Sequence, residues 1–117
     1  MARTGNPALA ADEQSCAGQL AKFFPQSAPV RIPVQVTAPR GGNAHLREAT
    51  VVEFSGGDHA IFLSTLPLEF GDQVKLEATM KGIFADATVD AVQYHEGRKA
   101  VAVKFLSGHG DWVVRQP

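Results

Sequence analysis

A polar corner within an apolar stretch is the part of the sequence best suited to holding a ligand. The stretch VVEFSGGDHAIFL covers residues 51–63 and contains two strand-like segments separated by Ser55, Gly56, Gly57 and Asp58. A serine hydroxyl and a glycine backbone can both approach a bound group closely. The same residue types also suit a tight turn, because they supply special backbone angles. The corner is therefore either a plain hairpin or part of a ligand site.

Other residues that could carry chemistry do not form a recognisable site. No histidine has a helical i, i+4 partner or a carboxylate in a ligand pattern, and all fall in predicted loops or at strand ends, so surface positions are expected. The histidines are His45, His59, His95 and His109.

Catalytic readings of the corner are also unsupported. A serine nucleophile in a strand-to-helix elbow follows a glycine two residues earlier, and Glu53 occupies that position before Ser55. The Gly56–Gly57 pair lacks the lysine and hydroxyl residue of a phosphate-binding loop and does not lead into a helix. Asp86 and Asp90 fall on a polar strand face, where solvation explains them. We therefore expect a protein that is not an enzyme and has no metal site or resident cofactor.

Composition is that of an ordinary globular domain. The chain has 117 residues, of which 44% are hydrophobic and 20% charged, so a single domain with its own core is expected. The net charge is -1 and the pI is about 6.4. No overall positive field would attract polymeric nucleic acid, although a small anion could be held locally.

Cysteine content and hydropathy bear on the compartment. Cys16 is the only cysteine, so an intrachain disulfide and a cysteine-based zinc site are both excluded. The first residues contain no apolar signal segment, and no later stretch approaches the length of a membrane span. These features predict a cytoplasmic protein without a membrane partner.

The first 25 residues suggest one amphipathic helix. Asn6 and Pro7 resemble a helix start, and Pro25 a stop. Apolar residues recur between them at helical spacing: Leu9, Cys16, Leu20, Phe23 and Phe24. Gly18 weakens this pattern, and the segment could equally be a flexible tail that joins the fold near Leu20. Residues 1–25 are thus predicted as a helical segment or tail, and 26–117 as the domain.

From Val30 onward the apolar period changes to two, which indicates strands. Pro33 cannot donate to a sheet, so the first strand is expected at an edge or a bend. Glycine-containing turns separate the others. The six expected strands cover residues 30–37, 46–54, 59–65, 73–80, 83–91 and 101–105.

Short strands with almost no helix between them favour an antiparallel barrel or sandwich over a parallel sheet. Ala85, Ala87 and Ala91 on one inward face fit the tapered interior of a small barrel. Trp112 in the tail could plug one end.

Four segments together resemble the PilZ domain, the six-stranded barrel family of cyclic di-GMP receptors. They are PVRIPVQV, VVEFSGGDHAIFL, PLEFGDQVKLE and AVAVKFL, and they span roughly residues 31–106. In that family an R-x-x-x-R segment before the first strand and a later [D/N]-x-S-x-x-G motif close around the dinucleotide. The resemblance implies a non-catalytic regulatory module of bacterial cyclic di-GMP signalling, with that dinucleotide as the candidate ligand.

The two motifs match only in part. Arg31 fits the second arginine of the first motif, whereas the first arginine position falls on Ser27. In the second motif Ser55 fits the serine, Glu53 replaces the Asp or Asn, and Asp58 stands where the last glycine belongs. Two arginines can fork onto guanine and neutralise phosphates, so half of that clamp is missing.

The resemblance implies one set of ligand residues: Arg31, Ser55, Gly56, Gly57 and Asp58. A guanidinium or ammonium from elsewhere could replace the missing arginine. The candidates are Arg3, Lys22, Arg40 and Arg47.

A second hypothesis is a protein-interaction or dimerisation domain that keeps the barrel but not the nucleotide site. Phe23, Phe24 and Trp112 are its candidate surface. A third, an oligonucleotide-binding barrel, needs a basic face with interleaved aromatics, and the single Tyr94 and single Trp112 argue against it.

Overall fold

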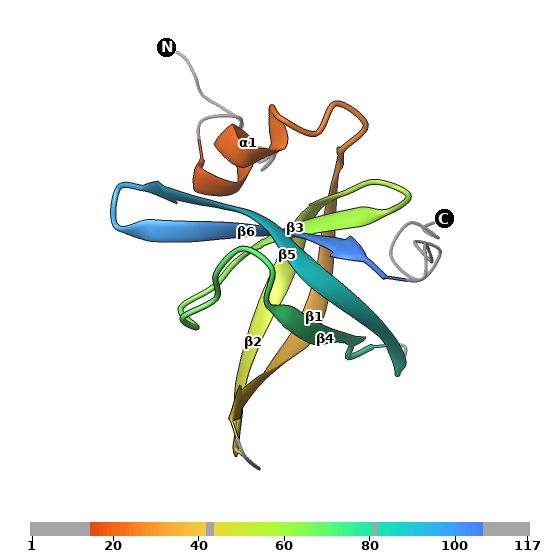
Figure 1. Ribbon diagram of the computed structural model, residues 1–117. Coiled ribbons are helices and arrows are strands. Elements are labelled where there is room, and N and C mark those ends of the chain that lie inside the picture. The colour runs from red at the N-terminus through yellow and green to blue at the C-terminus, as the bar shows by residue number, and fades with distance from the viewer. Residues whose placement is uncertain (1–14, 42–43, 81, 107–117) are drawn as a thin grey trace.

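A computed structural model of the chain describes residues 15–41, 44–80 and 82–106 and shows a closed antiparallel β-barrel with one short helix on its outside (Figure 1). The strands are β1 (Ala28–Gly41), β2 (Ala44–Ser55), β3 (His59–Leu63), β4 (Gln73–Ala78), β5 (Ile83–His95) and β6 (Arg98–Phe105). Their order around the barrel is β1-β2-β3-β6-β5-β4, and β1 also pairs with β4. The predicted six-stranded antiparallel barrel is confirmed.

The expected edge position of the first strand is wrong. β1 pairs with β2 on one side and with β4 on the other. Pro33 is accommodated because its carbonyl accepts a bond from the Thr79 N–H at 3.2 Å, just beyond the β1–β4 register, so no N–H of Pro33 is needed there. Pro33 pairs in regular register with Val51, and the irregularity of the β1–β2 pairing lies before it, between Pro29 and Ile32.

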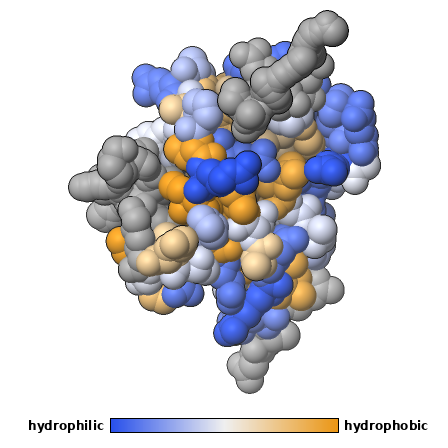
Figure 2. Space-filling view, turned by 180° about the vertical axis from the view of Figure 1, so that it is seen from behind, coloured by the Kyte–Doolittle hydropathy of each residue, from blue (hydrophilic) through white to orange (hydrophobic). Residues whose placement is uncertain are grey.

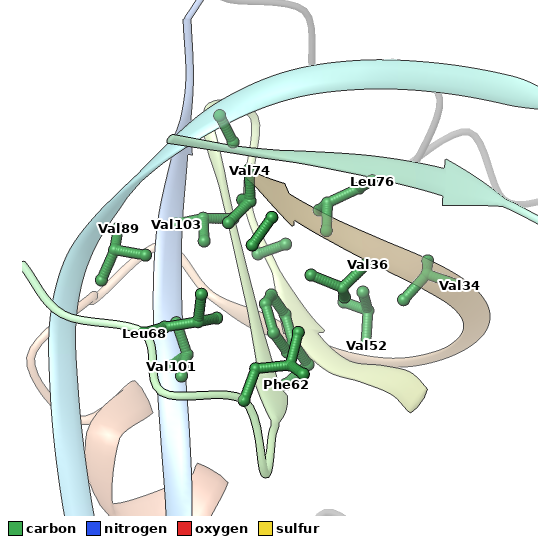
Figure 3. Close-up of a cluster of buried hydrophobic side chains, with 14 of the residues drawn as sticks. Val34, Val36, Val52, Phe62, Leu68, Val74, Leu76, Val89, Val101 and Val103 are labelled. Carbon is green, nitrogen blue, oxygen red and sulfur yellow. The ribbon is translucent and has the colours of Figure 1, made fainter. Parts of the chain in front are cut away.

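The barrel interior is filled by β-branched and aromatic side chains from all six strands, together with Leu66 and Leu68 from the loop before β4. Figure 3 draws most of these side chains, ten of them labelled, converging between the strands. Phe62 and Leu76 are the largest of the fully buried interior side chains, and Phe105 at 3% exposure adds a second aromatic ring. This packing fixes the strands, and hence the ends of β1, β2 and β3 at which the predicted corner lies.

The single helix of the described chain is α1, which covers only Cys16–Ala21. The predicted N-terminal helix is therefore wrong in its start, because the described helix begins only at Cys16. Ser15 caps it by accepting a hydrogen bond from the Gly18 N–H at 2.9 Å. Residues 1–14, including the expected helix start at Pro7, lie outside the described residues. No helix in the described part of the chain is long and apolar enough to cross a bilayer.

A second apolar cluster joins α1 to the outer surface of the barrel. Cys16, Ala17 and Leu20 of α1 pack there against outward-facing residues of the sheet. Those sheet residues are Phe54, Ile61, Ala100 and Ala102, with Leu63 and Ala91 at the margin. In Figure 1, α1 lies over the strands rather than at the open end of the barrel.

Ala91 belongs to this outer cluster and not to the interior, contrary to the prediction. Ala85 and Ala87 do pack on or in the interior cluster. A register shift between Val89 and Ala91 inserts an extra residue into β5, which turns the following side chain to the opposite face. Trp112, the predicted plug, lies outside the described residues.

Candidate functional site

The corner between β2 and β3 is held by its own serine. Ser55 Oγ donates to the carbonyls of His59 at 3.0 Å and Gly56 at 3.2 Å, and the Gly56 N–H donates to the His59 carbonyl at 3.1 Å. Ser55 is only 2% exposed. Its hydroxyl therefore stabilises the hairpin in this conformation instead of facing solvent.

His59, at the start of β3, is buried, so the expectation of a surface histidine is wrong at this position. Its Nε2 lies 2.6 Å from Ser27 Oγ, and its Nδ1 lies 3.1 Å from Asp58 Oδ1. The ring of Phe24 packs beside it, with centroids 4.9 Å apart. The hydrogen bond from His59 lowers the pKa of Asp58. No local sequence pattern indicates this cluster, because Ser27 and His59 are 32 residues apart.

The two glycines of the corner have different surroundings. A Cβ on Gly56 would lie 2.5 Å from His59 Cε1 and 3.2 Å from the Gln26 carbonyl, so only glycine fits there. A Cβ on Gly57 would meet nothing within 4 Å. Gly57 and Asp58 are exposed, whereas Gly56 is buried.

Ser27, His59 and Asp58 repeat the hydrogen-bond order of a serine hydrolase triad. Nucleophilic catalysis also needs free donors for an oxyanion. The neighbouring backbone donors are in use, since the Ser27 N–H bonds the Phe24 carbonyl at 2.8 Å and the Gly56 N–H bonds His59. The Asp58 side chain is also 62% exposed. The chain of bonds therefore fastens the segment before β1 to the corner.

Arg31 lies next to the corner on the outer surface. Ala28 pairs with Ser55 in the β1–β2 register, which places the start of β1 beside the corner. Arg31 itself is exposed and lies in the irregular part of that pairing. Its positive charge acts to lower the pKa of Glu53. Arg31 lies within β1, as in the strand expected over residues 30–37, whereas the family motif places its arginine before the first strand.

Glu53 brings a second arginine into this region. Burial raises the pKa of Glu53, and the positive charges of Arg31 and Arg98 partly oppose that rise. Arg98 begins β6, directly after the hairpin turn in which Glu96 and Gly97 adopt positive φ angles of 53° and 80°. Sequence reasoning treated this stretch as a turn and missed Arg98, because the start of β6 comes near β2 only through the long-range pairing of β6 with β3.

The proposed substitutes for the missing arginine are less favourably placed. Arg47 pairs with Thr37 toward the other end of the β1–β2 hairpin. Lys22 is the exposed C-cap of α1. Arg3 and the Arg40 side chain lie outside the described part of the structure.

A groove of about 560 Å³ opens beside Arg98 and is large enough for a small organic ligand. Its lining includes Glu48, Tyr94 and Lys99. Burial alone would raise the pKa of Glu48, but hydrogen bonds from Ser64 and Thr65 outweigh it, and that pKa is lowered. The Glu48 carboxylate is thus ionised and held in place.

A second groove, of about 370 Å³, is lined by residues of β1, β2, β4 and β5 and by Leu106, and none of the predicted ligand residues is among them. Within residues 15–41, 44–80 and 82–106, no group of three or more histidine, cysteine or acidic side chains could hold a metal ion.

Comparison with known proteins adds no relative. No protein-family model matches the chain, and no curated protein matches its sequence. The functional reading of the site therefore comes from its geometry and from the motif resemblance.

Proposed function

We propose that this protein is a non-catalytic regulatory module of the PilZ type that binds cyclic di-GMP on the outer barrel surface between Arg31 and Arg98. The proposal is carried by the placement of two positive charges, on Arg31 in β1 and Arg98 in β6, close enough to Glu53 to oppose the rise of its pKa on burial, two residues before the corner serine. Arg98 would supply from β6 the guanidinium that the first motif lacks at Ser27.

The chemistry of this surface suits a flat dianion. Guanidinium groups bind phosphates through paired hydrogen bonds and stack on bases. Tyr94, which is 71% exposed beside Arg98 in the groove, offers a ring face for a guanine. Ligand phosphates would replace the Glu53 carboxylate as the partner of both arginines.

The roles of the corner residues change accordingly. Ser55 and Gly56 are buried, so in this conformation they stabilise the hairpin and do not contact a ligand. The ligand contacts would come from Arg31, Arg98 and the exposed Gly57. Asp58 places a negative charge near the same surface and is held by His59. It acts against anion binding, which is the effect expected of an acid at the motif's last glycine.

Isothermal calorimetry with cyclic di-GMP tests the proposal. Arg31→Ala and Arg98→Ala should each weaken binding by about tenfold or more, because a charge-assisted bond contributes about 1.5–3 kcal/mol. Glu53→Gln should tighten binding, because it removes the competing carboxylate. Arg47→Ala, at the far end of the hairpin, is the matched control and should bind as the unmodified protein does. Absence of heat at high micromolar ligand in the unmodified protein and in all four variants would exclude the nucleotide role.

A second candidate, ligand-independent self-association, is favoured by exposed apolar residues around the β4–β5 turn. Met80 is 79% exposed, Phe84 59% and Ile83 41%. Of the residues expected to form such a surface, Phe23 is exposed while Phe24 is half-buried against His59. Figure 2 shows apolar patches reaching the surface between charged groups on the face it displays.

Light scattering distinguishes this candidate. If the β4–β5 turn is the contact, Met80→Ser with Phe84→Ser should abolish a dimer, whereas Phe23→Ser should leave it intact. A monomer at every concentration in the unmodified protein would rule out self-association.

A further inference from the structure

The segment Phe24–Ser27, between α1 and β1, lies directly on the corner. Three contacts hold it there. Phe24 packs on the His59 ring, the Gln26 carbonyl lies against Gly56, and Ser27 Oγ lies 2.6 Å from His59 Nε2. The segment also closes on itself, since the Ser27 N–H donates to the Phe24 carbonyl at 2.8 Å.

This segment covers Gly56, while Ser55 beside it is turned into the hairpin by its own hydrogen bonds. Ser55 is 2% exposed, and the backbone of Gly56 is buried between the Gln26 carbonyl and His59. Gly57 and Asp58, which the segment does not cover, remain exposed. The covered and uncovered halves of the corner therefore meet between Gly56 and Gly57.

We propose that Phe24–Ser27 is an autoinhibitory strap that closes the corner, and that the bonds Ser27–His59–Asp58 are its latch. Opening the strap would expose Gly56 and allow the Ser55 hydroxyl to turn outward beside Arg31. This inference rests on the proposed function, because it names the regulation of the same nucleotide surface. Ser27, at the position of the missing motif arginine, then acts as a positioning residue for the closed state.

The latch depends on His59 being held from both sides. With Nδ1–H donating to Asp58, Nε2 accepts from the Ser27 hydroxyl. Lys104, paired with His59 across the β3–β6 register, and Asp58 are the charged groups at this ring. A serine hydroxyl can either donate or accept, so protonation of His59 keeps the contact. Competition by a ligand, and not acidification, is therefore the expected means of opening.

Hydrogen exchange and calorimetry on the full chain test the strap. Ser27→Ala removes the latch hydroxyl, and Ser27→Thr retains it. In Ser27→Ala, the backbone amides of residue 27 and Gly56 should exchange about threefold to tenfold faster, which corresponds to the loss of one ordinary hydrogen bond. Cyclic di-GMP should bind tighter by a similar factor, because a larger fraction of the protein is open. Ser27→Thr should behave as the unmodified protein.

Controls separate the strap from general destabilisation. Thr79→Ala removes an exposed hydroxyl bond outside this region, to the Pro33 carbonyl at 3.3 Å, and should leave both readouts at the corner unchanged. If Ser27→Ala does not fold, Phe24→Ala loosens the strap from its other end and should give the same exchange pattern.

The outcomes are distinct. Unchanged amide exchange at residue 27 and Gly56 in both Ser27→Ala and Phe24→Ala overturns the strap. Faster exchange with unchanged or weaker binding of cyclic di-GMP also overturns it, since Ser27 would then not oppose the ligand. Faster exchange without heat from cyclic di-GMP in any variant supports the strap and removes the nucleotide function instead.

Discussion

At the residue scale, the carboxyl group of Glu53 is the acidic group on which the charges of Arg31 and Arg98 both act. Its carboxylate is half-buried beside Arg31 and Arg98, yet its pKa is raised, because burial disfavours the charged form more than the two guanidiniums favour it. An ionised Glu53 therefore lowers the free energy of unfolding near neutral pH. Its presence is better explained by electrostatics at the surface than by stability, since its charge partly offsets those of the two arginines.

Glu53→Gln is accordingly expected to raise the free energy of unfolding at pH 7, because it removes a half-buried charge. A raised pKa means that the folded state binds the proton more tightly than the unfolded state. The stabilisation from that proton is complete below about pH 4.3 and is lost as pH rises through the folded pKa. The advantage of Glu53→Gln should therefore vanish on acidification.

Urea unfolding at several pH values measures this advantage, with Glu69→Gln in an exposed turn as the control for charge removal. An advantage that grows as pH falls would mean that Glu53 has a lowered pKa and forms a stabilising ion pair.

Residue types predicted the location of the site better than its roles. Arg31 and the corner do lie at the same end of the β1–β2 pair. The Ser55 hydroxyl could have faced either solvent or the hairpin, and only the positions of the His59 and Gly56 carbonyls decide between them. The role of Arg98 could not be predicted, because no local sequence pattern relates the start of β6 to β2.

At the scale of elements, the corner combines one glycine that is required with one that is not. Gly56→Ala would place a methyl group 2.5 Å from His59 Cε1, which forces the ring away and breaks its bond to Ser27. We expect Gly56→Ala to lower the free energy of unfolding by about 1–3 kcal/mol. Gly57→Ala has open space around its Cβ and is the matched control, expected within about 0.5 kcal/mol.

Chemical denaturation compares the two variants directly, and hydrogen exchange at residue 27 locates the damage. Equal stability of both variants would show that His59 moves aside freely, and that the ring is not wedged between Gly56 and the strap.

Helix α1 is too short to be stable alone and depends on its contact with the barrel. Leu20 is 3% exposed in that contact, and Cys16 beside it is 4% exposed, with a thiol pKa raised by burial. Leu20→Ala should destabilise the attachment by about 2 kcal/mol or more. Because thiol reagents need the exposed thiolate, labelling of Cys16 should accelerate by at least about tenfold.

Labelling kinetics with a disulfide reagent give the test, and Phe23→Ala, at a residue 70% exposed, should leave the rate unchanged. Acceleration in Leu20→Ala without faster exchange of β6 amides would confirm local detachment. Equal acceleration of both would mean that α1 and the barrel open together.

The apolar periodicity of the sequence predicted the inward side chains correctly where the strands are regular, and wrongly where an extra residue interrupts a strand. The alternation over residues 73–80 placed Val74, Leu76, Ala78 and Met80 on one face. The first three are in the interior cluster, whereas Met80 lies beyond the end of β4 and is 79% exposed. The extra residue before Ala91 shifts the alternation, which a simple period of two cannot anticipate. Helical spacing likewise reaches from Leu9 to Phe24, but the described helix stops at Ala21, because a cap and tertiary contacts set its limits.

At the scale of the whole molecule, closure makes every strand a neighbour of two others. β4 is short, yet it joins β1 to β5 and completes the ring. Leu76 of β4 is fully buried in the shared interior. Since that interior is one cluster with contributions from all strands, damage to the closing strand should spread to the opposite side of the barrel.

Leu76→Ala is therefore expected to lower the global free energy of unfolding by about 2–5 kcal/mol through the cavity it leaves. Amides of β3 and β6, which do not pair with β4, should exchange faster by the same factor as those of β4. Phe84→Ala, on the outer face of the neighbouring β5, is the control and should change stability by no more than about 0.5 kcal/mol. Acceleration confined to β4 and β5 would show that the closing strand can separate while the rest of the barrel persists, and cooperativity would then end at the β1–β4 seam.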